Sequence, residues 1–131
     1  MLEGAYLVSH GGTVPGREAY VGPLLQRSQN FWREQERQGK VRIIGPFFLA
    51  PGGGARDDMA FFTLYQGKLA DLAAIVISEE YERIYAVAAQ VTKNFTGRLF
   101  GGGTEQEISR IMAVSAAEWV GAGLMGGQAK G

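Results

Sequence analysis

Apolar and polar positions divide the first half of the chain into short extended segments and one helical segment. Residues 5–10 (AYLVSH) are rich in strand-forming residues and stop at a Gly-Gly pair, which predicts a first strand. Residues 24–39 carry apolar side chains at helical spacing, which predicts an amphipathic helix ended by Gly39. Residues 41–50 and 58–66 are β-branched and aromatic, which predicts two further strands.

The two middle strands differ in the places that the sequence predicts for them. Gly45–Pro46 interrupts residues 41–50, and because proline has no N–H for a strand ladder, this strand should lie at an edge or carry a bulge. Residues 58–66 are apolar on both faces, which predicts an interior strand covered on both sides. Between the first strand and the helix, Pro15 and Pro23 predict an irregular loop.

The second half begins with a helical region and ends with another. Residues 68–76 predict a helix, and Ser78 is suited to cap a second helix, with an apolar face from Tyr81 to Val91. Residues 94–102 predict the last strand. Thr104 and Glu107 have the spacing of a capping box at the start of a C-terminal helix. Its apolar seam comprises Ile108, Ile111, Met112, Ser115 and Trp119.

The order of these elements predicts an α+β fold: a ferredoxin-like βαββαβ unit plus a C-terminal helix. Right-handed crossovers give a four-stranded antiparallel sheet in the order 4-1-3-2 with the helices on one face. We expect one domain over residues 1–122, which includes the C-terminal helix 104–122, and a flexible Gly-rich tail over 123–131. This arrangement leaves the second face of the sheet without helices, although residues 58–66 are apolar on that face too. We expect a homodimer that covers it, because large exposed apolar patches mark interfaces.

Composition removes several classes of function. The chain has 131 residues, with 13 basic and 13 acidic side chains, so it lacks the basic excess that nucleic-acid binding requires. It has no cysteine and one histidine, which excludes thiol chemistry and leaves no metal or cofactor site to expect. No signal-peptide pattern and no apolar run of bilayer length is present, so no membrane partner and a cytoplasmic location are the expectations.

The run GKVRIIGPFFLAPGGG (39–54) resembles the YCII-like branch of the dimeric α/β-barrel superfamily. The stretch ADLAAIVISEEYERIYAVAAQ, followed by NFTGRLF, is similar to the same group, and the resemblance covers most of residues 4–103. It implies that two sheets pack face to face into a barrel. It also implies a cleft between helices and sheet that takes small, often cyclic molecules. Relatives with an activity include isomerases, lyase-like enzymes and cofactor-poor monooxygenases.

The chain departs from that group at the start of the first helix. Relatives commonly carry an Arg-Pro-Ala-His run there, with the histidine paired to an aspartate. This chain has Arg17-Glu18-Ala19-Tyr20 instead. The usual His–Asp assignment of the group therefore does not carry over.

The rim of the predicted sheet offers one candidate catalytic site. His10 ends the first strand, beside the start of the third strand, where Asp57 and Asp58 lie. An aspartate that orients the imidazole would make His10 a general base, with Tyr20 as proton donor. The substrate-binding candidates are Arg17, Arg56, Trp32 and Arg98, where the arginines would hold an anionic group. The alternative is a strand-end histidine bonded to a loop, with the two aspartates as turn residues.

Two function classes therefore remain from the sequence. One is a small-molecule-binding protein or cofactor-independent acid/base enzyme, whose ligand would be small and cyclic or anionic. The other is a catalytically silent ligand-binding or assembly module. A haem protein is the weakest alternative, because haem-binding relatives use a histidine on a helix. The glycines at 52–54 fit a hairpin better than a phosphate loop, and those at 101–103 precede a helix start where an anion could bind.

Overall fold

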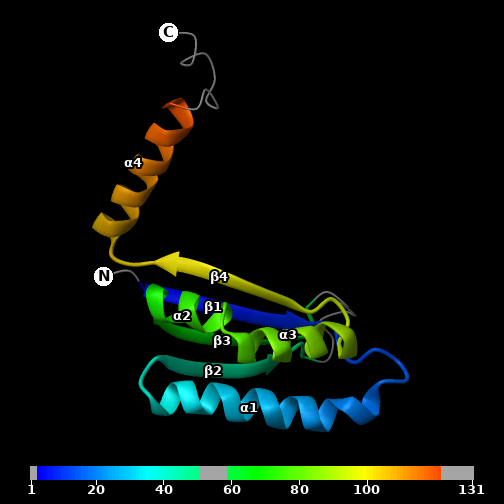
Figure 1. Ribbon diagram of the computed structural model, residues 1–131. Coiled ribbons are helices and arrows are strands. Elements are labelled where there is room, and N and C mark those ends of the chain that lie inside the picture. Colours follow the sequence, from blue (N-terminus) through cyan, green and yellow to red (C-terminus); the bar gives the residue numbers. More distant parts are fainter. Residues whose placement is uncertain (1–2, 51–58, 122–131) are drawn as a thin grey trace.

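A computed structural model describes residues 3–50 and 59–121. Within these residues, nine elements follow one another (Figure 1). They are β1 (Glu3–His10), η1 (Glu18–Tyr20), α1 (Val21–Arg37), β2 (Val41–Phe48), β3 (Phe61–Lys68), α2 (Leu69–Val76), α3 (Glu79–Val91), β4 (Thr96–Gly102) and α4 (Glu105–Gly121). The protein is therefore an α+β domain, as the hydrophobic pattern predicts.

The four strands form one antiparallel sheet in the order β2-β3-β1-β4. Read from the other edge, this is the order 4-1-3-2. The prediction that the Gly45–Pro46 strand lies at an edge or carries a bulge is confirmed, because β2 does both. Its pairing with β3 shifts register between Ile44 and Phe47, at the cis Gly45–Pro46 peptide.

Three helices cover one face of the sheet (Figure 1). Helix α1 packs beside β2, α2 lies against β1, β3 and β4, and α3 contacts both other helices. The core lies between this helix layer and the sheet, and it is built around aromatic rings. Its buried members are Tyr6, Leu24, Phe31, Trp32, Val41, Tyr65, Leu72, Ile75, Tyr81, Ile84, Ala88 and Val91.

Two glycines, Gly4 and Gly101, let α2 approach the sheet closely, and Gly67 beside them makes room for the Lys40 carbonyl. Gly4 pairs with Gly67 on β3 and with Gly101 on β4, so the three lie in one row across the sheet. A Cβ on Gly4 would lie 3.0 Å from the Leu69 Cα and 3.0 Å from a Leu72 methyl group. Helix α2 begins directly after β3 and therefore lies close to the sheet. Residues without a side chain leave the space that it needs.

The predicted helix caps are present. The Ser78 hydroxyl accepts a hydrogen bond from the Tyr81 N–H, and Thr104 and Glu107 form the reciprocal pair of a capping box. Gly39 follows α1 with φ +76°, a conformation that glycine adopts without strain. The expected irregular loop up to residue 23 is wrong at its end. Pro23 lies in the first turn of α1, where its missing N–H has no helical partner to lose.

The second face of the sheet carries no helix among the described residues. Strand β3 is interior to the sheet, as predicted, but within the described residues only its helix side is covered. Helix α4 leaves the end of β4 and points away from the rest of the domain (Figure 1). The predicted tail at 123–131 lies outside the described residues. No helix in the described part of the chain has the length and hydrophobicity needed to span a bilayer.

Candidate functional site

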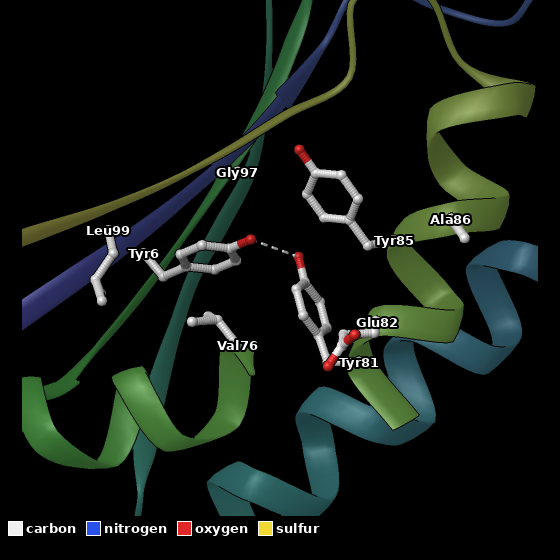
Figure 2. Close-up of a pocket in the computed structure, with 8 residues that line it drawn as sticks. All are labelled: Tyr6, Val76, Tyr81, Glu82, Tyr85, Ala86, Gly97 and Leu99. Carbon is white, nitrogen blue, oxygen red and sulfur yellow. Dashed lines mark hydrogen bonds between the residues drawn. The ribbon is translucent and has the colours of Figure 1, made fainter. Parts of the chain in front are cut away.

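A cleft of about 430 Å³ opens between helix α3 and strand β4. Strand β1 supplies its floor through Tyr6, and α3 supplies Tyr81 and Tyr85 (Figure 2). The end of α2 contributes Val76 to the apolar part of the wall. This volume falls in the range of small-molecule sites, which lie in concave and mostly apolar clefts.

Two tyrosine hydroxyls meet inside the cleft. The Tyr81 hydroxyl donates to the Tyr6 hydroxyl at 2.9 Å, and Figure 2 shows the two groups pointing toward each other. Burial raises the pKa of Tyr6 and raises the pKa of Tyr81, and the hydrogen bond that Tyr81 donates raises its pKa further. Both phenols therefore stay protonated at neutral pH. Tyr6 accepts the hydrogen bond from Tyr81, and no acceptor for its own hydroxyl proton is found among the described residues. This proton can therefore be donated to a ligand.

Gly97 on β4 makes room for the Tyr6 hydroxyl. A Cβ at this position would lie 2.0 Å from the Tyr6 Oη and 3.2 Å from a ring carbon of Tyr85. No side chain fits there unless the tyrosines move. The hydroxyl pair and the open space beside it thus depend on a glycine near the start of an edge strand.

The remaining wall of the cleft is apolar except at one place. Val76, Ala86 and Leu99 present aliphatic surface, and Glu82 is the one charged residue among the described residues that line the cleft. Behind the floor, Trp32 stacks on Tyr65 with ring centroids 3.8 Å apart. The cleft therefore offers aliphatic and aromatic surface, a neutral hydrogen-bond donor, and negative charge at Glu82.

At the end of β1 the structure shows local contacts of His10, and its predicted role as a general base stays a prediction. Its Nδ1 accepts the Gly12 N–H at 3.0 Å, and its ring stacks on Phe61 with centroids 5.0 Å apart. An aspartate that orients a catalytic histidine would accept a hydrogen bond from Nδ1–H, but here Nδ1 accepts the Gly12 N–H. Around it, Gly11 donates to the Lys93 carbonyl and Lys93 donates to the Gly12 carbonyl. These contacts fit the alternative of a strand-end histidine bonded to a loop, and they do not test its pairing with Asp57 or Asp58.

The stability of the fold should depend on pH through His10. Burial lowers the pKa of His10 below its ordinary value of 6.5, so the unfolded chain binds a proton at a higher pH than the folded one. The free energy of unfolding should therefore fall as pH drops through about 6.5 toward the lowered value. Urea unfolding between about pH 7.5 and 5.5 measures this slope. The variant His10→Asn keeps a side-chain acceptor for the Gly12 N–H but has no group that titrates in this range. Its free energy of unfolding should therefore not depend on pH there. An equal slope in both proteins would contradict the assignment.

Of the other predicted rim residues, the two that the structure describes do not gather around His10. The Arg17 guanidinium donates to the Gln90 carbonyl, which ties the loop before α1 to the end of α3. Tyr20 is 60% exposed and forms no hydrogen bond with His10 among the described residues. Arg56, Asp57 and Asp58 lie outside the described residues, so their proposed pairing with His10 stays a prediction.

Two predicted substrate contacts occupy other parts of the fold. Trp32 is 2% exposed and is packed among Tyr6, Tyr65 and Tyr81, which makes it a core residue rather than a ligand contact. Arg98 pairs with Leu7 on the sheet face opposite the helices, so it is remote from the cleft. Within the described residues, no group of three acidic, histidine or cysteine side chains could hold a metal ion.

Sequence reasoning missed the tyrosine pair, although the family resemblance implies a cleft between the helices and the sheet. It assigned Tyr81 and Tyr85 to the packing face of a helix, and it gave Tyr6 no role beyond its strand. One signal was available, because an isolated glycine inside a strand often marks a close approach of another group. Gly97 is such a glycine, but the sequence alone does not show which side chain approaches it.

The comparisons with known proteins add no name to this geometry. The chain matches no protein-family model and no curated protein. The site must therefore be interpreted from its own chemistry.

Proposed function

We propose that this protein binds a small, neutral and mostly apolar molecule that carries an oxygen acceptor such as a ketone or quinone carbonyl. The observation that carries the proposal is the buried Tyr81–Tyr6 hydroxyl pair inside the cleft. A raised pKa keeps the Tyr6 phenol protonated, so it serves as a donor at neutral pH. A carbonyl oxygen is the group that such a donor recognises.

The charge of the lining supports a neutral ligand over an anionic one. Glu82 is the charged residue among those that line the cleft, and the arginines Arg17 and Arg98 lie elsewhere. A carboxylate ligand would lose its hydration without gaining a cationic partner. This proposal keeps the small cyclic ligand expected from the sequence and replaces the anionic one.

We also propose that the working unit is a homodimer. Support comes from the sheet face opposite the helices, where apolar residues of β2, β3 and β1 form one row that no described helix covers. A second copy of the chain would cover it. The face-to-face barrel is the form of this dimer that the YCII-like resemblance implies.

Two probes of the same shape test the binding proposal. The first, 2-acetylnaphthalene, carries a carbonyl, and 2-ethylnaphthalene lacks it. Tyr6→Phe should weaken binding of the ketone about tenfold, because one hydrogen bond is lost, and should leave the hydrocarbon unchanged. Isothermal titration calorimetry measures both constants. A third probe, 2-naphthoate, should bind more weakly than the ketone to the unmodified protein.

The matched control is Tyr20→Phe, which removes the hydroxyl of an exposed tyrosine outside the cleft. It should change neither constant. If the unmodified protein binds ketone and hydrocarbon equally, or if Tyr6→Phe weakens both to the same extent, the carbonyl assignment is wrong. If none of the probes binds, the cleft is not a site for this class of molecule.

A further inference from the structure

The open face of the sheet combines apolar and basic side chains. Residues that pair across antiparallel strands share one face, and the Ile44–Leu64–Leu7–Arg98 row lies opposite the helix layer. The adjacent row on this face runs Arg42–Gln66–Ala5–Phe100. Farther along, Lys68 pairs with Glu3, the one acidic residue in these rows. The face is therefore apolar at its centre with a basic excess.

Helix α4 has the complementary character. Ile108, Ile111 and Met112 lie on one side of it, and Met112 is 65% exposed. Glu105 and Glu118 lie on either side of this stripe by helical spacing, and α4 has three acidic side chains and one basic side chain. Glu118 lies in the last turn, where a negative charge opposes the helix dipole and a cationic partner would relieve it.

The dimensions of α4 also fit this face. Its 17 residues span about 25 Å, which matches the length of a strand of eight residues at roughly 3.3 Å per residue. A groove of about 550 Å³ joins the base of α4 to the open face through Gln66 and Phe100. The Thr104–Glu107 capping box fixes where the helix begins, and from there it runs away from its own sheet (Figure 1).

We propose that α4 packs on the open sheet face of a second copy of this chain. Its apolar stripe would cover the Ile44–Leu64–Leu7 row, and its acidic side chains would lie near Arg42 and Arg98. This inference rests on the proposed homodimer and names the segment that covers the face. Direct contact of two sheets would bring the arginines of both copies together, whereas α4 brings carboxylates to them.

A pair of lysine substitutions on opposite sides of α4 tests the proposal in the full chain. Met112→Lys places a cation on the apolar stripe, and Ala117→Lys places the same charge on the other side of the helix. Both positions are exposed in the single chain, so neither should disturb its fold. We expect Met112→Lys to raise the dimer dissociation constant at least about thirtyfold and Ala117→Lys to change it little. Sedimentation equilibrium measures both constants.

The outcomes separate this inference from the homodimer itself. If the unmodified chain is a monomer, both proposals fail. If it is a dimer that Met112→Lys and Ala117→Lys leave equally intact, the homodimer stands and the role of α4 is overturned. Loss of the dimer in Met112→Lys alone supports the inference.

Crosslinking identifies the surface that α4 contacts. Because the chain has no cysteine, Met112→Cys and Leu7→Cys can be introduced into separately tagged copies and joined by a short bismaleimide. A crosslink between the two different copies is the expected product. If Met112→Cys copies crosslink only with each other, α4 pairs with α4 and the proposed docking on the sheet is wrong.

Discussion

Trp32→Ala should lower the free energy of unfolding by about 3–5 kcal/mol, the range found when a fully buried aromatic residue is truncated. Trp32 stacks on Tyr65 and meets the rings of Tyr6, Tyr81 and Phe31, so its removal leaves a cavity bounded by four other rings. Those rings also hold the floor of the cleft. Urea unfolding followed by circular dichroism at fixed protein concentration measures the change.

Leu25→Ala on the same helix is the matched control. Leu25 is 50% exposed and is not a member of the buried core. The substitution should change the free energy of unfolding by no more than about 0.5 kcal/mol. If Trp32→Ala cost no more than Leu25→Ala, Trp32 would not hold the core together as described.

Gly97→Ala should close the cleft and destabilise the fold. The added methyl group would lie 2.0 Å from the Tyr6 Oη, and the Tyr6 side chain is buried and has little room to move. Overpacking of this kind costs about 1–3 kcal/mol. Moving Tyr6 also breaks its hydrogen bond with Tyr81, so 2-acetylnaphthalene should bind more than about tenfold more weakly. Calorimetry and urea unfolding measure the two effects.

Gly102→Ala provides the comparison on the same strand. A Cβ at Gly102 would meet no heavy atom within 4 Å, so the same change of residue introduces no clash. Binding of the ketone should be unchanged. Should Gly97→Ala bind the ketone as tightly as the unmodified protein, the Tyr6 hydroxyl would not be the donor that recognises it.

The order of elements could be predicted from the sequence because each boundary has a local signal. Gly39 ends α1, Ser78 separates α2 from α3, and Thr104 with Glu107 starts α4. The register shift in β2 follows from Gly45–Pro46, because proline lacks the N–H that a strand ladder needs. Each of these signals acts within a few residues of the structure that it specifies.

The site could not be predicted in the same way, because it depends on contacts between distant residues. Tyr6 and Tyr81 are 75 positions apart, and Gly97 comes from a third element. Each has an ordinary structural explanation when it is considered alone. His10 attracted attention because it is the one histidine in the chain, but its Nδ1 is held by the Gly12 N–H only two residues away.

The most direct test of the central claim is to locate bound 2-acetylnaphthalene by isotope-filtered NMR on the uniformly ¹³C-labelled protein. We expect nuclear Overhauser effects from the probe to the ring protons of Tyr6, Tyr81 and Tyr85, which line the cleft in Figure 2. They should disappear in Gly97→Ala. Contacts confined to the open sheet face or to α4, or no contact with any of the three tyrosines, would contradict the account.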